Sequence, residues 1–145
     1  MNSSTATDLN INRIRDPSAD SGKQALEYIR QNISTYSALT GRDAGTYESL
    51  TELAAALKDC WLVFEAVPEI RTLKENTFVD LETHDPQDCI LGSNSSSYKT
   101  GDLVGKISDE TKKRVLSTHY MMPPEVQSLH LFVSTLADLF LGSPR

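Results

Sequence analysis

The sequence predicts an α/β domain built on a parallel sheet with flanking helices. Three short apolar segments, residues 61–66, 89–93 and 115–119, are typical of buried strands because they are bounded by turn residues and rich in branched or aromatic side chains. Between them, apolar residues recur at helical spacing. Strands that alternate with helices favour parallel pairing through right-handed crossovers, so we expect these three strands to be neighbours in one sheet.

The first half of the chain shows the same alternation. Residues 1–10 are rich in Ser, Thr and Asn without any period, which predicts a flexible tail. Residues 11–17 predict a short strand that stops at a proline, and residues 18–39 predict a helix. Ser18 or Ser21 could cap the start of that helix, and Gly41 ends it. Residues 46–50 predict a minor strand and residues 52–59 a short helix.

The second half contains the most apolar strand. Residues 60–67, CWLVFEAV, predict a strand buried on both faces that ends at Pro68. Helices are expected over residues 69–82 and 100–107. Residues 127–141 are apolar but have no clear helix cap.

Composition excludes several classes of protein. The chain has 145 residues, the size of one domain, and a net charge of -6, which argues against nucleic-acid binding. No apolar run approaches the roughly 20 residues of a membrane span, and the first residues lack the apolar core of a secretory signal. We therefore expect a cytoplasmic protein. Its two cysteines, Cys60 and Cys89, are too few for a disulfide scaffold and are expected to be buried thiols in strands.

Candidate functional residues follow the ends of the predicted strands, where ligands of parallel sheets bind. Glu69 and Lys74 follow the first buried strand, Asn94 and Ser96 follow the second, and His119 ends the third. Each has a structural alternative. Glu69 and Lys74 could belong to a solvated helix face, the serines and Asn94 could form a helix cap, and His119 could be structural.

Two further expectations concern single residues. Asp16 ends the first strand before Pro17, where a turn or a helix cap is the structural alternative to a ligand contact. The histidines His84, His119 and His130 have no zinc-like spacing, so we expect no metal site.

Taken in order, three segments form a more specific pattern. LVFEAVPEIRTLKENTF, CILGSNSSS and RVLSTHYMMPP resemble the NAD-binding domain of 3-hydroxyacyl-CoA dehydrogenases, in particular fungal members with a THY-M-PP pattern. RIRDPSADSGKQALEYIRQNI resembles the second strand and following helix of that domain. The resemblance covers residues 11–131, leaves residues 132–145 unassigned, and implies a Rossmann-like sheet.

The resemblance implies NAD as cofactor and assigns residues to its two ends. Asp16 matches the acidic residue that hydrogen-bonds the adenosine ribose. Glu69 and Lys74 match contacts on the nicotinamide side. Asn94 and Ser96 match a motif whose serine contacts substrate and cofactor.

The resemblance also implies a reaction. His119 matches the catalytic histidine, which takes a proton from the 3-hydroxyl of an acyl-CoA substrate, with Ser96 beside it, in fatty-acid metabolism. A neutral imidazole near pH 7 suits that task.

The sequence departs from the family pattern in ways that affect activity. The glycine-rich GxGxxG turn, the first strand and helix, and the C-terminal helical domain have no counterpart in it. The missing strand is the central one, so we expect a gap in the sheet. The glutamate that pairs with the family's histidine is replaced by His130. We therefore expect an incomplete or inactive dehydrogenase. The alternatives are a non-catalytic α/β interaction module, with a homodimer formed through open sheet edges, or a gene-model fragment.

Overall fold

The computed structural model describes residues 11–41, 45–120 and 130–132. It divides the chain into two compact units, Met1–Ala56 and Leu57–Arg145. The expected flexible tail at residues 1–10 lies outside the described residues, as does most of the unassigned segment at residues 132–145.

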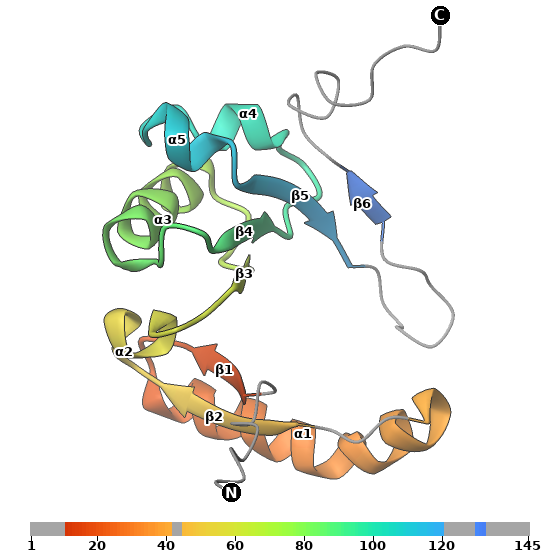
Figure 1. Cartoon of the computed structure of the whole chain (residues 1–145). Helices are drawn as coiled ribbons and strands as arrows, with labels where there is room; N and C mark the ends of the chain where they lie inside the picture. Colours follow the sequence, from red (N-terminus) through yellow and green to blue (C-terminus); the bar gives the residue numbers. More distant parts are fainter. Residues whose placement is uncertain (1–10, 42–44, 121–129, 133–145) are drawn as a thin grey trace, which may run out of the picture. The chain divides into compact units, whose positions relative to one another are not determined.

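The first unit is a βαβ motif (Figure 1). Strand β1 (Ile11–Arg15) pairs in parallel with β2 (Thr46–Leu50), and α1 (Ala19–Thr40) connects them. Ser18 caps α1 by accepting a hydrogen bond from the Ser21 N–H, which decides between the two expected caps. Gly41 ends the helix in the left-handed conformation that only glycine adopts readily. Helix α2 (Leu53–Leu57) follows.

The second unit carries a four-stranded sheet in the order β3-β4-β5-β6. Strands β3 (Leu62–Glu65), β4 (Ile90–Ser93) and β5 (Val115–His119) are parallel neighbours, which confirms the expected sheet. Strand β6 (His130–Phe132) adds in antiparallel fashion and sets His130 opposite His119 in the ladder. Three helices connect the parallel strands: α3 (Arg71–His84), α4 (Thr100–Leu103) and α5 (Asp109–Lys112).

The core of this unit lies between the sheet and its helices. Phe78 and Leu81 project from α3 and are buried, as are Leu91 of β4 and Val115 of β5. Among the residues whose burial the structure describes, the other buried apolar side chains of the second unit are Leu57, Cys89, Leu103, Val104 and Ile107. The apolar residues of α3 are thus spaced so that they lie on the face of the helix that packs against the sheet, as the periodicity predicts.

The parallel strands form two separate sheets, with β1 pairing only β2 and β3 pairing only β4 among the described residues. This arrangement corrects the prediction that residues 60–67 are buried on both faces: Phe64 is 44% exposed, and Trp61, just before β3, is 67% exposed. A strand at the edge of a sheet lacks one neighbour, so its side chains stay partly in water.

Several details of the elements also differ from the sequence prediction. The helix expected over residues 100–107 ends at Leu103, and a second short helix, α5, begins after Ser108, which caps it by accepting from the Thr111 N–H. Cys60 and Cys89 precede their strands instead of lying within them. Strand β6 lies inside the apolar segment 127–141, for which no strand was predicted.

Gly92 allows close packing on one face of the second sheet. A β-carbon at this position would lie 2.8 Å from Thr118 Oγ1 and 3.0 Å from Phe64 Cδ1. We therefore expect Gly92→Ala to lower the free energy of unfolding by about 1–3 kcal/mol, as overpacking does. Gly101→Ala is the matched control, because nothing lies within 4 Å of its added β-carbon. Urea unfolding followed by circular dichroism measures both, and equal effects of the two substitutions would contradict the packing argument.

Candidate functional site

Asp16 lies at the end of β1 in the first unit. Its backbone N–H extends the ladder to Leu50, and its Oδ1 accepts a hydrogen bond of 2.7 Å from the Ser18 N–H. The carboxylate therefore shapes the turn into α1, which is the structural role that the sequence left open for it. It also stands beyond the carboxyl end of a parallel strand, where ligands of such sheets bind.

In the second unit, a buried ion pair lies beneath the ends of the strands. Lys74 Nζ is 2.8 Å from Glu65 Oε1, and the side chains are 1% and 0% exposed. The ammonium also donates to the Val67 carbonyl oxygen, and the second carboxylate oxygen of Glu65 accepts from Ser93 Oγ at 2.8 Å. Each charge thus has an opposite charge and further hydrogen bonds, which a buried ion pair requires. The solvated-face alternative is therefore wrong for Lys74.

Glu69 connects this ion pair to the loop after β4. Its Oε2 is 3.2 Å from Lys74 Nζ, while its Oε1 accepts from Ser95 Oγ at 2.5 Å and from the Ser97 N–H at 2.9 Å. Partial desolvation disfavours its ionisation, but the hydrogen bonds from Ser95, Ser97 and Lys74 outweigh that effect and lower the pKa of Glu69 to about 2. Glu69 is therefore an anion that holds the loop in place.

The loop also determines how β4 and β5 end. The Asn94 N–H donates to the Glu65 carbonyl oxygen, and Asn94 Oδ1 accepts from the Tyr120 N–H at 2.8 Å. Asn94 thus ties the end of β4 to the residue after His119. Ser95 Oγ in turn accepts from the Tyr98 N–H within the loop. The next helix, α4, begins only at Thr100 with Lys99 as its N-cap and no side-chain cap, so these serines and Asn94 do not form the helix cap that the sequence left open.

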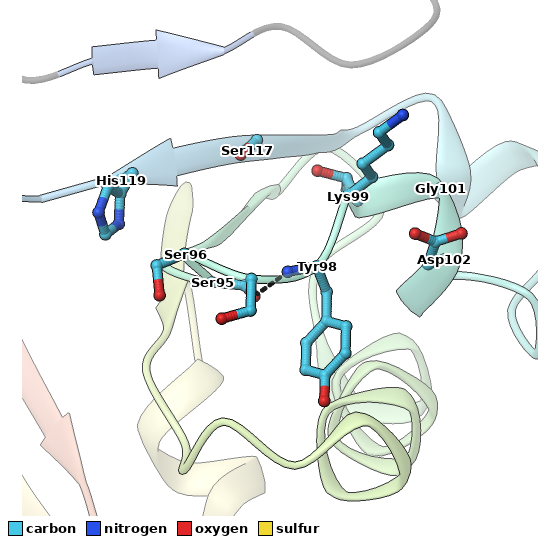
Figure 2. Close-up of a pocket in the computed structure, with 10 residues that line it drawn as sticks. Ser95, Ser96, Tyr98, Lys99, Gly101, Asp102, Ser117 and His119 are labelled. Atoms are coloured by element: carbon cyan, nitrogen blue, oxygen red, sulfur yellow. Dashed lines mark hydrogen bonds between the residues drawn. The ribbon is translucent and has the colours of Figure 1, made fainter.

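A pocket of about 460 Å³ opens beside this loop (Figure 2). Residues 95–102 line one side, and Ser117 and His119 of β5 line the other. Two polar atoms of lining residues are buried and have no partner among the described residues: Thr100 Oγ1 and His119 Nδ1. Because a buried polar atom without a hydrogen bond is costly, these two atoms are the unsatisfied polar groups that the structure describes in the pocket wall.

The structure thus brings four of the six candidate residues together. Ser96 and His119 line the pocket, Glu69 holds the loop that carries Ser96, and Asn94 holds the strand end that carries His119. Lys74 lies in the same network but is buried behind Glu69. Asp16 belongs to the other unit.

Sequence reasoning missed the groups that support this site. Glu65 was not singled out, although it lies in the segment LVFEAVPEIRTLKENTF, and Ser93 and Ser95 were considered only among the serines that could form a helix cap. A charged residue that interrupts an otherwise apolar strand is the signal that could have revealed Glu65, because such a charge requires a buried partner.

The described residues contain no cluster of three or more His, Cys, Asp or Glu side chains that could hold a metal ion. Among the same residues, no helix combines the length and apolar character needed to cross a membrane.

The first prediction from this geometry concerns the buried ion pair. We expect Lys74→Met or Glu65→Leu alone to lower the free energy of unfolding by about 3–5 kcal/mol, because each leaves an unpaired buried charge. The double substitution should cost less than the sum of the two, since it removes both charges. Lys113→Met is the control, because the Lys113–Glu110 pair is exposed and its loss should have little effect. Strict additivity of the two buried substitutions would show that the pair is not coupled.

The second prediction concerns pH. The pKa of Glu69 is lowered to about 2 in the folded chain, so its ionised form stabilises the fold above the ordinary pKa of 4.5, and that contribution disappears as the pH falls toward 2. We expect the difference in unfolding free energy between the wild type and Glu69→Gln to be constant above about pH 5 and to shrink between pH 4.5 and 2. Urea unfolding of both proteins at each pH measures this difference in unfolding free energy. A difference that stays constant between pH 4.5 and 2 would contradict the lowered pKa of Glu69.

A family model described as 3-hydroxyacyl-CoA dehydrogenase, NAD binding domain, matches residues 4–135. The glyoxysomal fatty acid beta-oxidation multifunctional protein MFP-a of Brassica napus is 42% identical over 82 residues, which are 55% of this chain and 11% of that protein. A peroxisomal fatty acid beta-oxidation multifunctional protein of Arabidopsis thaliana is 40% identical over 82 residues, with the same coverage. The chain thus spans about a tenth of the length of these curated relatives.

Solved structures show the same fold. A diketoreductase has a TM-score of 0.72 at 25% identity, covering 85% of this chain and 46% of that one. The 3-hydroxybutyryl-CoA dehydrogenase of Escherichia coli has a TM-score of 0.66 at 24% identity, covering 79% of this chain and 25% of that one. With the strand-end geometry and the family match over residues 4–135, these comparisons show that the chain belongs to the NAD-binding domain family of 3-hydroxyacyl-CoA dehydrogenases.

Proposed function

We propose that this chain supplies the nicotinamide side and the catalytic histidine of an NAD-dependent 3-hydroxyacyl-CoA dehydrogenase of fatty-acid oxidation. The observation that carries the proposal is the pocket in which His119 of β5 lies across from the loop that carries Ser96 and is anchored by Glu69. Relatives of the chain are named as fatty acid beta-oxidation proteins, and they are far longer than it is. By itself the chain is expected to be incomplete as an enzyme.

The candidate residues fit the ribose ends of NAD better than its pyrophosphate centre. Glu69 is ionised and its side chain is 35% exposed, so its carboxylate can accept hydrogen bonds from ribose hydroxyls. Asp16 is the corresponding candidate for the adenosine ribose. No GxGxxG turn occurs in the sequence, so the contacts that usually hold the pyrophosphate are not encoded in these 145 residues. When bound, NAD supplies the hydride acceptor for oxidation of an alcohol.

The histidine would move the proton of that reaction. In this proposal the ring nitrogen of His119 that faces the substrate accepts the proton of the 3-hydroxyl, while Ser96 donates a hydrogen bond to the substrate oxygen. His119 Nδ1 is buried without a partner among the described residues, so no carboxylate there stabilises the protonated ring. The backbone of His130 lies opposite His119 where the family pattern led us to expect a glutamate. Proton transfer is therefore weakly supported in this chain.

Location and partners are part of the proposal. The substrate class is a small acyl-CoA, without nucleic acid or membrane as partner. The curated relatives are named as glyoxysomal and peroxisomal proteins, whereas the cytoplasmic location expected from the sequence remains a prediction.

One observation favours the alternative of an interaction module. Strand β3 pairs on one side only among the described strands, and Phe64 and the adjoining Trp61 are exposed. An open edge with aromatic side chains is suited to pairing with another strand, including that of a second copy.

Titration with NAD and a short-chain 3-hydroxyacyl-CoA tests the proposal. Two or three hydrogen bonds of about 0.5–1.5 kcal/mol each barely offset an association cost of about 4 kcal/mol or more, so we expect millimolar or weaker binding. In amide NMR spectra, both ligands should shift Ser96, Ser97 and His119, and NADH absorbance should show no appreciable turnover.

Matched variants make this experiment decisive. Ser96→Ala and His119→Ala should reduce the shifts caused by the acyl-CoA, whereas the remote Lys113→Met should not. An interaction module predicts no shift at these residues with either ligand, and that outcome would overturn the proposal. Micromolar affinity for NAD would contradict the expected weakness and would require a different phosphate site.

A further inference from the structure

The two cysteines of the chain lie side by side. Cys60 Sγ and Cys89 Sγ are 3.4 Å apart, although 29 positions separate them in the sequence. Both are free thiols; Cys89 is buried and Cys60 is partly exposed. They precede β3 and β4 and so lie at the amino ends of these strands, whereas the pocket lies at the carboxyl ends of β4 and β5. We propose that Cys60 and Cys89 form an oxidisable dithiol, which a peroxide converts into an intrachain disulfide.

The surrounding backbone holds the two sulfur atoms near each other. The Ile90 N–H donates to the Trp61 carbonyl oxygen at 2.9 Å, which joins the residues adjacent to the two cysteines. Arg114 donates to the carbonyl oxygens of Cys89 and Pro86 and to Asp85 Oδ2, so the turn before β4 is anchored. A disulfide has a sulfur–sulfur distance of about 2.0 Å. The sulfur atoms therefore need to approach by less than 1.5 Å, about the movement that a side-chain rotation provides.

The two thiols are unequal, which sets the order of the chemistry. Burial, together with the adjoining sulfur of Cys60, raises the pKa of Cys89 to about 12, so Cys89 remains a thiol at neutral pH. Cys60 is the accessible one and reacts first. Its thiolate sulfur attacks one oxygen of hydrogen peroxide; the S–O bond forms, the O–O bond breaks, and the displaced hydroxide takes up the thiol proton as water.

The second step closes the disulfide. The sulfur of Cys89 attacks the sulfenic sulfur of Cys60; the S–S bond forms, the S–O bond breaks, and hydroxide leaves with the Cys89 proton as water. In total, two thiols and one hydrogen peroxide give one disulfide and two waters. Since the thiolate of Cys89 is scarce near neutral pH, this step should be faster at pH 9 than at pH 7.

The disulfide would close a loop of the chain that contains the buried ion pair on which the site is built. Residues between the two cysteines include β3, α3 and the Glu65–Lys74 ion pair. A cross-link over such a loop restricts the unfolded chain more than the folded one, so it stabilises the fold. Because the cysteines lie at the opposite ends of the strands from the pocket, the bond should leave the pocket residues in place.

Peptide mapping of the full chain tests the proposal. The chain is treated with hydrogen peroxide at low protein concentration, alkylated, and digested with trypsin without reduction. Cleavage after Lys58, Arg71, Lys74 and Lys99 releases residues 59–71 with Cys60 and residues 75–99 with Cys89. We expect these two peptides joined, with a mass two hydrogens below their sum, and no linked dimers of the chain. The joined peptide should form faster at pH 9 than at pH 7.

The thermal stability of the oxidised chain provides a second, independent test. The oxidised chain should unfold at a midpoint higher by at least about 4 °C than the reduced chain, and dithiothreitol should reverse the shift. Cys60→Ala, at the partly exposed position, should abolish both the joined peptide and the shift. Recovery of Cys89 as an alkylated thiol together with Cys60 oxidised to sulfinic acid would overturn the proposal, as would disulfides between chains only.

Discussion

The candidate site depends on one buried interaction, the ion pair between Glu65 and Lys74. Both side chains are removed from water, so the pair persists only because Val67, Ser93 and Glu69 complete its hydrogen bonds. Glu65 belongs to β3 and Lys74 to α3, while Ser93 ends β4. One charge pair therefore fixes the helix and two strand ends relative to one another, and the loop that lines the pocket is built on this frame.

The same constraint assigns Lys74 a role different from the direct cofactor contact that the resemblance implies. To reach a ligand, its ammonium would have to leave the Glu65 carboxylate unpaired in the core, a change that costs about 3–5 kcal/mol. The hydrogen bonds gained to a ligand contribute less than that. Lys74 is better understood as a positioning residue, which acts through Glu69 by holding that carboxylate against Ser95 and Ser97.

Much of the fold could be predicted from the sequence, because residues close together in the chain define most of its elements. The three parallel strands carry continuous apolar runs, and α1 has both a capping serine and a terminal glycine, so neighbouring residues define these elements. Strand β6 could not be predicted because pairing with β5, and not its own three residues, defines it. The exposure of β3 was missed for a similar reason, since an apolar strand has the same sequence at the centre and at the edge of a sheet.

The residues of the site also divide into those that the sequence could predict and those that depend on contacts between distant segments. Glu69, Asn94, Ser96 and His119 could be placed together because carboxyl ends of parallel strands meet at one edge, a rule of topology that needs no side-chain detail. The network behind them could not be predicted, because Ser93 and Glu65 are 28 positions apart and meet only through the register of β3 and β4. The contacts between the ends of β4 and β5 leave Nδ1 of His119 unpaired among the described residues. Because the Asn94 side chain already binds the Tyr120 N–H, it fixes the backbone beside His119 but leaves the imidazole unsupported. The strand end is therefore positioned for catalysis more completely than its histidine is.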